Sequence, residues 1–86
     1  MKKQDFQLLV ETGDVERVVI SREWVHGLPA LWELYAYGGN ATESRGNRLC
    51  TARGEGREFR TLDTAYGFAR DCGWRSGITL EDRFLP

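Results

Sequence analysis

The alternation of hydrophobic and polar side chains at the start of the chain predicts a β-hairpin. Phe6, Leu8 and Val10 are separated by single residues, the period of two that is typical of a strand with one buried face. Gly13 can adopt the positive φ that a tight turn requires. The returning segment, residues 16–21, is rich in β-branched side chains that favour strands. We therefore expect two antiparallel strands joined at this glycine.

The segment that follows is open to two interpretations. Residues 22–28 are expected to be a linker, and residues 29–37 begin with proline and are followed by glycine, which would suit a short helix. Against a helix, the hydrophobic side chains alternate with other residues, and aromatic residues favour strands. We favour a strand, which would place Glu33, Tyr35 and Tyr37 on one face.

The middle of the chain predicts a surface loop and a second, shorter hairpin. Residues 39–47 are polar and contain glycine, as surface loops do. Residues 48–53 and 57–60 are then expected to form two short strands. A Gly-Glu-Gly sequence at 54–56 would form the turn between them.

The clearest pattern is that of a helix over residues 62–72. Its apolar side chains follow the i, i+3, i+4, i+7 spacing and are Leu62, Ala65, Tyr66, Ala69 and Cys72. Thr61 is a suitable N-cap, and Gly73 a suitable left-handed C-terminal residue, after which Trp74 would fold back on the last turn. Phe68 lies beside the stripe, so it would either widen the buried face or offer a ring to a partner.

These elements predict a single α+β domain over residues 1–86. At 86 residues the chain has room for one core. We expect an antiparallel sheet of four to five strands, with the helix at about 62–72, in the C-terminal half, packed on one face. Residues 75–86 fit either an edge strand or an ordered extension.

Charge is balanced overall but unevenly distributed. Twelve basic and thirteen acidic residues give a formal charge of −1, which excludes a uniformly basic coat for nucleic acid. Residues 1–44 carry four basic and seven acidic side chains, whereas residues 45–75 carry seven arginines and four acidic side chains. The second half is therefore where contacts with an anionic partner are to be sought.

Five arginines crowd the predicted loop and second hairpin, and they are the candidate contacts to nucleic acid or a partner: Arg45, Arg48, Arg53, Arg57 and Arg60. The guanidinium fork binds phosphate bidentately and stacks on bases. A charged, solvated strand face that resists aggregation explains the same pattern. We favour the solvated face because Glu55 and Glu58 lie within the cluster and partly cancel its field.

Aromatic residues on the predicted strands suggest either a stacking platform for bases or the core of a small domain. We favour the core, to which we assign Trp32, Phe59, Tyr66 and Trp74. A surplus remains as a candidate aromatic interface, formed by Trp24, Trp32, Tyr35 and Tyr37. Because one helix covers only part of a sheet, we predict a homodimer that buries this surplus.

Residues able to perform catalysis or bind metal are sparse. His26 is the single histidine and has no neighbouring carboxylate or nucleophile to complete a catalytic pair, and the spacing of Cys50 and Cys72 fits no zinc site. We predict no enzymatic activity, no metal, no cofactor and no small-molecule substrate. No apolar segment approaches the length of a signal sequence or of a membrane span, so we expect a cytoplasmic protein with reduced thiols and no membrane contact.

The sequence of residues 49–73 resembles that of ParC-type partition-associated proteins, small proteins encoded by plasmids and mobile elements and unrelated to the topoisomerase subunit of similar name. The shared pattern is a strand ending in an Arg-Gly turn, a phenylalanine-bearing strand, and a Thr-Leu-Asp-x-Ala helix that closes on glycine. With the upstream segment 32–35, the resemblance extends over roughly residues 31–73.

This resemblance implies a non-enzymatic accessory protein of plasmid or mobile-element maintenance in a bacterial cytoplasm. Such a protein would bind another plasmid maintenance protein, or DNA. The near-neutral charge favours protein–protein contacts. The alternative is a small dimeric nucleic-acid-binding module that uses the arginine-rich hairpin.

Overall fold

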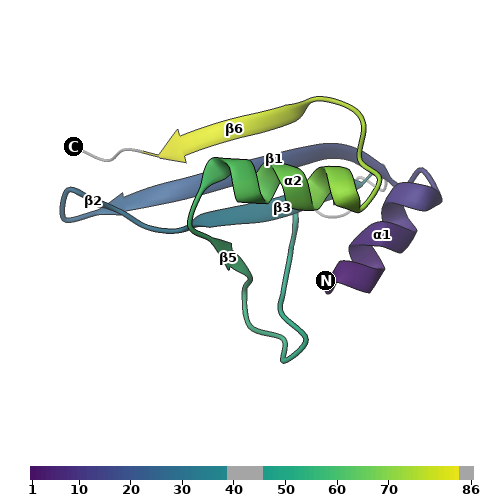
Figure 1. Ribbon diagram of the computed structural model, residues 1–86, viewed down its shortest axis with the longest axis horizontal. Coiled ribbons are helices and arrows are strands. Elements are labelled where there is room, and N and C mark those ends of the chain that lie inside the picture. The colour runs from purple at the N-terminus through teal and green to yellow at the C-terminus, as the bar shows by residue number, and fades with distance from the viewer. Residues whose placement is uncertain (39–45, 84–86) are drawn as a thin grey trace.

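The computed structural model describes residues 1–38 and 46–83 and has an α+β architecture (Figure 1). The helices are α1 (Lys3–Glu11) and α2 (Leu62–Asp71). The strands are β1 (Val15–Val25), β2 (Leu28–Pro29), β3 (Trp32–Gly38), β4 (Asn47–Arg48), β5 (Glu58–Phe59) and β6 (Ile78–Arg83). The predicted fold class is confirmed in broad terms, with one more strand and one more helix than expected. Arg45 and most of the predicted loop at 39–47 lie outside the described residues.

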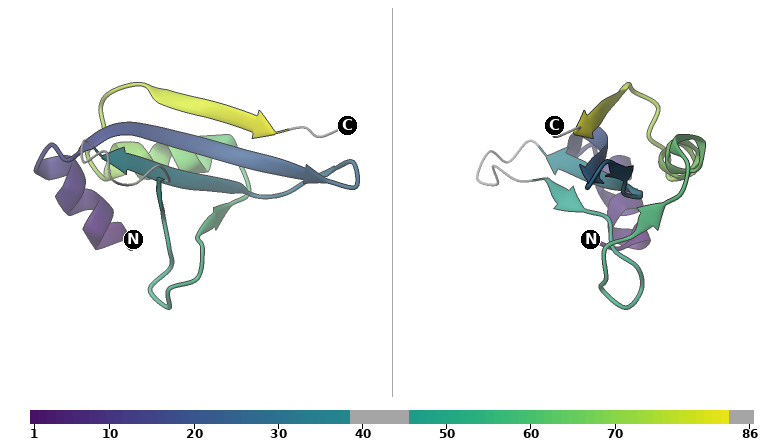
Figure 2. Two further views of the ribbon diagram at one scale, coloured as in Figure 1. Left: turned by 180° about the vertical axis from the view of Figure 1, so that it is seen from behind. Right: turned by 90° about the vertical axis from the view of Figure 1, so that its left-hand side faces the viewer.

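The sheet is built around β1, which pairs with β3 on one side and with β6 on the other (Figure 2). Ile20 of β1, for example, is opposite Leu34 of β3 and Leu80 of β6. Strand β6 runs parallel to β1, whereas the other strand pairs are antiparallel. The expectation of a purely antiparallel sheet is therefore corrected. Strand β5, like β1, is antiparallel to β3, and α2 then carries the chain across one face of the sheet to the opposite edge. Strand β6 therefore runs in the same direction as β1, because a helical crossover joins parallel strands.

The predicted linker at residues 22–28 is instead the end of β1 and a tight turn. His26 and Gly27 both have positive φ, at 52° and 77°, which is the backbone of a two-residue type I′ hairpin turn. The register then shifts by one residue between the Trp24–Pro29 pair and the pairing of β1 with β3. A two-stranded arm with this irregularity results. Within residues 29–37 the chain forms the end of β2 and most of β3, so the strand is confirmed and the helix is not formed.

The predicted strand at residues 5–11 is wrong, because this segment forms helix α1. Phe6, Leu9 and Val10 also satisfy the i, i+3, i+4 spacing of a helix, so periodicity over so short a stretch does not distinguish the two. Phe6 is fully buried, and its ring stacks on that of Phe68 in α2, with the centroids 6.4 Å apart. Leu8 points away and is 59% exposed. This tertiary contact selects the helix, and the Asp5 carboxylate accepts the Lys2 backbone N–H at 2.9 Å to cap it.

The predicted second hairpin is only partly formed. Strands β4 and β5 each pair with β3, not with each other. Between them the chain makes a single bridge, Cys50 with Gly56, and the Thr51 N–H donates to the Glu55 carbonyl at 2.6 Å. Because β3 offers its free edge to both segments, the intervening residues form a projecting loop instead of a regular ribbon (Figure 1).

Helix α2 begins and ends as predicted. The Thr61 hydroxyl accepts the Thr64 N–H at 3.2 Å, and Gly73 has a φ of 99°. The Trp74 N–H donates to the Ala69 carbonyl, which closes the last turn. The helix lies on one face of the sheet, where the largest part of the core is found. That core includes Trp32, Phe59 and Trp74, as favoured above, with Tyr66 partly buried beside it.

Candidate interaction surfaces

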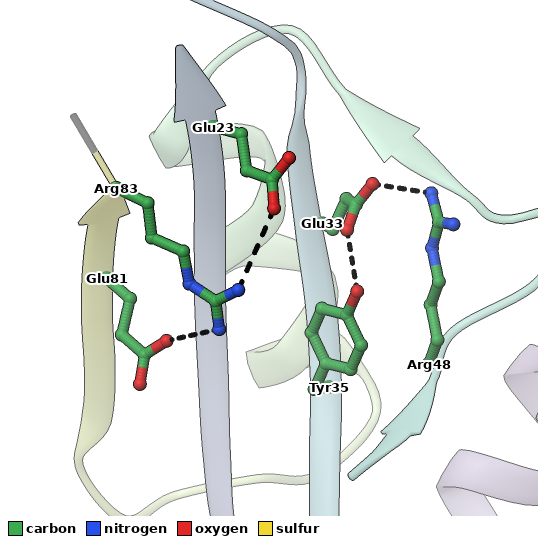
Figure 3. A network of polar contacts seen from close by, with 6 residues as sticks. All are labelled: Glu23, Glu33, Tyr35, Arg48, Glu81 and Arg83. Atoms are coloured by element: carbon green, nitrogen blue, oxygen red, sulfur yellow. Dashed lines mark hydrogen bonds and ion pairs between the residues drawn. The ribbon is translucent and has the colours of Figure 1, made fainter. Parts of the chain in front are cut away.

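The face of the sheet opposite α2, called here the open face, carries the most extensive polar network (Figure 3). Glu33, Tyr35 and Tyr37 share this face, as the alternation of β3 predicts, while the residues between them are buried. Arg48 of β4 is opposite Tyr35, and Arg83 of β6 is the parallel neighbour of Glu23. Cross-strand register therefore places basic and acidic side chains side by side.

Glu33 is the centre of one half of this network. Its carboxylate accepts hydrogen bonds from the Arg48 guanidinium and from the Tyr35 hydroxyl, both at 2.7 Å. Burial raises the pKa of the Tyr35 phenol to about 12, with a further contribution from the hydrogen bond to Glu33. The phenol is therefore a hydrogen-bond donor at neutral pH, and its proton is committed to this carboxylate.

Arg83 is the centre of the other half. Its guanidinium contacts Glu81 at 2.9 Å and Glu23 at 3.7 Å. The hydrogen bond to Glu81 is the main reason why the pKa of Arg83 is raised. The two arginines of this network are thus neutralised within the molecule.

A glycine makes the Arg48 position possible. A Cβ at Gly56 would overlap the Arg48 guanidinium. Gly56 therefore leaves the space through which this side chain reaches Glu33. This role explains why residue 56, the second glycine of the Gly-Glu-Gly sequence, has no side chain. The turn alone does not require a glycine at this position.

Another ion pair, Arg22 with Asp82, lies on the α2 side of the sheet, next to the buried Trp32. The Arg22 guanidinium lies 4.2 Å from the Trp32 ring centroid and 5.0 Å from that of Trp24. It also contacts both oxygens of Asp82, at 3.2 and 2.8 Å, and the Trp24 indole N–H donates to the same carboxylate at 2.6 Å. These bonds, that of Arg22 first, hold the pKa of Asp82 below its ordinary value.

The four candidate interface aromatics consequently do not form one surface. Trp24 and Trp32 flank Arg22 on the α2 side of the sheet, and Trp32 is buried in the core. Tyr35 and Tyr37 lie on the open face, where the Arg17 guanidinium is 4.4 Å from the Tyr37 centroid.

The candidate arginines are also divided. Arg48 is bound to Glu33, whereas Arg53, Arg57 and Arg60 are exposed and have no carboxylate within ion-pair distance among the described residues. Arg57 instead lies over two aromatic rings, with its guanidinium carbon 5.4 Å from the Phe59 centroid and 4.7 Å from that of Phe68. The candidate arginines of the predicted second hairpin therefore occupy separate positions in different surroundings.

The start of the chain, next to α1, lies against the segment between β4 and β5, a contact that sequence reasoning missed. The Cys50 N–H donates to the Met1 carbonyl at 2.6 Å. Lys3, in the first turn of α1, has its ammonium 6.0 Å from the Phe68 centroid. Lys3, Arg57 and Phe68 are called here the Phe68 site. No sequence signal joined Lys3 to the arginines once residues 5–11 had been interpreted as a strand.

The end of the β1–β2 arm is the most exposed apolar part of the described chain. Leu28 is 70% exposed, Val25 is 53% exposed and Leu31 is 41% exposed. These three residues are called here the hairpin tip. The sequence signal for this turn is the His-Gly pair between a β-branched and an apolar residue. The interpretation of residues 22–28 as a linker did not use it.

Within the described residues, no group of three or more His, Cys, Asp or Glu side chains is placed to hold a metal ion. Neither described helix is long and apolar enough to cross a membrane. Both cysteines are free, and burial raises the pKa of the Cys72 thiol. Comparison with known proteins gives no matching family model, no similar curated protein and no similar solved structure.

Proposed function

We propose that this chain is a non-enzymatic accessory protein of plasmid or mobile-element maintenance that binds another protein through its hairpin tip. The observation that carries the proposal is the exposure of Val25, Leu28 and Leu31 at the end of a two-stranded arm. The resemblance of residues 31–73 to ParC-type partition-associated proteins supports the biological setting.

The geometry of the arm suits a contact with a protein. Clustered exposed apolar side chains mark interaction sites more often than isolated ones do. The I′ turn at His26 and Gly27 fixes the backbone that presents them, so little conformational entropy is lost on binding. Burial of each Val or Leu side chain contributes roughly 1.5–3 kcal/mol, so three residues can anchor a partner.

The open face is less suited to this role. Its arginines and carboxylates already satisfy one another, and a partner would have to desolvate these pairs on docking. The hairpin tip presents apolar surface without that cost, which favours it as the contact.

Photocrosslinking tests the proposal in bacterial cells that carry the plasmid or mobile element encoding this chain. A photoreactive residue at position 28 is expected to form an adduct with one maintenance protein, and Leu31→Asp is expected to abolish that adduct. The matched control places the photoreactive residue at the exposed Asp63 of α2. Equal adducts at positions 28 and 63, or normal plasmid retention by a Leu28→Asp variant, would contradict the proposal.

The alternative partner of the hairpin tip is a second copy of the chain, and in that case we propose a homodimer formed there, with the adduct at position 28 joining two copies. Apolar contact between two tips would supply burial that a small domain lacks. Sedimentation equilibrium at tens of micromolar protein is expected to give a dimer for the parent chain and a monomer for Leu28→Asp. A monomeric parent chain would refute the dimer.

A further inference from the structure

Two cations from distant parts of the sequence converge on one aromatic ring. The Lys3 ammonium and the Arg57 guanidinium carbon lie 6.0 and 4.7 Å from the Phe68 centroid. Burial raises the pKa of the neighbouring Cys72 thiol; Lys3 and Arg57 both act to lower it, and the Asp71 carboxylate acts to raise it. The Phe68 site is therefore a locus of positive charge built from α1, α2 and the segment before β5.

Neither cation is neutralised. Arg22, Arg48 and Arg83 each have a carboxylate within 4 Å, but no carboxylate of the described residues lies that close to Lys3 or Arg57. Their partners are rings, which attract a cation through the quadrupole without cancelling its charge. The field of these two side chains is therefore available to an external anion.

Both cations also stand on fixed supports. Lys3 is three residues from Phe6, which is fully buried and stacked on Phe68. The Arg57 backbone N–H donates to the carbonyl of Leu49, itself fully buried, at 2.9 Å. Such preorganisation lowers the entropy that the side chains lose when they bind a ligand.

We infer that the Phe68 site binds the phosphate backbone of a nucleic acid strand, with Lys3 and Arg57 contacting phosphates. Lys2, adjacent to Lys3 and exposed, extends the positive charge along the start of α1. Such contacts are independent of base sequence. The inference uses none of the residues of the hairpin tip, so each of the two proposals can be refuted without the other.

A phosphate strand suits the site better than an acidic peptide. The guanidinium fork binds phosphate and carboxylate groups alike, but its flat face also stacks on nucleic acid bases. Arg57 is exposed and has Phe59 and Phe68 beneath its guanidinium, so the guanidinium can stack on a base, which an acidic peptide does not supply. Asp5 and Glu58 flank the two cations in sequence and moderate the field, so binding should be weak and strongly salt-dependent.

Fluorescence anisotropy of a labelled oligothymidylate of about 20 nucleotides tests the inference. At about 20 mM salt the parent chain is expected to bind in the micromolar range. The Lys3→Gln/Arg57→Gln variant should bind about tenfold or more weakly, with the slope of log K against log salt reduced by about 1.4, since each lost contact to a single strand is worth about 0.7.

The matched control is Arg75→Gln/Arg83→Gln, which removes the same charge away from the Phe68 site. It should keep the parent's affinity to within about threefold and its salt slope. An equal loss in this control, or no binding by the parent chain at low salt, would overturn the inference. So would binding of polyglutamate with the affinity of the oligonucleotide, since the site would then recognise acidic chains in general. Leu28→Asp should bind the oligonucleotide normally, which separates this test from that of the hairpin tip.

Discussion

The arginines of the sheet and the cations of the Phe68 site occupy surroundings that differ in one chemical respect. Across the sheet, Arg48 and Arg83 each lie next to a carboxylate on a neighbouring strand. At the Phe68 site, Lys3 and Arg57 lie over an aromatic ring. Both environments hold a cation in place, but the carboxylate cancels its charge and the ring does not.

This difference indicates which positive side chains can serve a partner. Paired charges on the open face stabilise the register of strands and contribute little external field. Unpaired charges supported by rings are fixed in position and retain their field. The sequence alone does not distinguish the ion-paired arginines from the ring-supported cations. Their contacts in the folded chain do.

The largest effect is expected on removing the support of the Phe68 site. Phe6→Ala should lower the free energy of unfolding by about 3–5 kcal/mol, because it deletes a fully buried ring. In the folded fraction it should also weaken oligonucleotide binding, since α1 and Lys3 lose their contact with Phe68. Urea denaturation measures the first effect. Leu8→Ala, on the exposed side of the same helix, is the control and should change stability by less than about 0.5 kcal/mol.

A smaller loss is expected on breaking the sheet pairing at Gly56. Gly56→Ala should displace the Arg48 guanidinium from Glu33 and lower stability by about 1 kcal/mol, the upper range for a half-exposed ion pair. Combined with Glu33→Gln in a double-mutant cycle, it should cost less than it does alone. By contrast, Gly67→Ala in α2, where a Cβ meets nothing, should stabilise the protein by roughly 0.5–1 kcal/mol. Additive losses at Gly56 and Glu33 would show that the glycine has no role in this pairing.

The pH at which Tyr35 titrates reports on the same network of Glu33 and Arg48. Its pKa of about 12 lies above the ordinary 10.0, so the folded state holds the phenol proton more tightly than the unfolded state does. This contribution to stability is complete below pH 10 and is lost as the pH rises towards 12. Ultraviolet titration of the three tyrosines should lose its most alkaline component in Tyr35→Phe, and Glu33→Gln should shift that component downward. An unchanged titration in Tyr35→Phe would assign the component to another tyrosine.

The smallest effect is expected at Asp82. Its pKa is held below the ordinary value by Arg22 and Trp24, so its contribution to stability is present above that value and is lost as the pH falls through the lowered pKa. Carboxyl carbon-13 shifts followed through acidic pH should place this titration below the ordinary value of an aspartate. Arg22→Gln should move it upward, and a titration unaffected by this change would contradict the bidentate contact.

The sequence was most informative where one signal had one structural meaning. Thr61, the apolar stripe and Gly73 defined α2 to within a residue, and the alternation in β3 correctly separated Tyr35 from its buried neighbours. The prediction for residues 5–11 was wrong because Phe6, Leu9 and Val10 fit a helix as well as Phe6, Leu8 and Val10 fit a strand, and the distant contact of Phe6 with Phe68 decides between them. Local pattern carries no information about such a contact.

The candidate surfaces were less predictable for the same reason. Arg48 and Arg57 are nine residues apart in similar sequence, and nothing local shows that one meets Glu33 and the other Phe68. Lys3 joined the Phe68 site only through tertiary structure. The hairpin tip did have a local signal in His26 and Gly27, since histidine is among the residues enriched at positive φ and glycine adopts it freely.

The claim that ring-supported cations, not ion-paired ones, face an external partner is tested most directly by a nuclear magnetic resonance titration with the oligothymidylate at low salt. We predict that amide and side-chain shifts change at Lys3, Arg57 and Phe68, and that those of Arg48 and Arg83 stay unchanged. Shifts concentrated on the open face around these last two arginines would contradict the account.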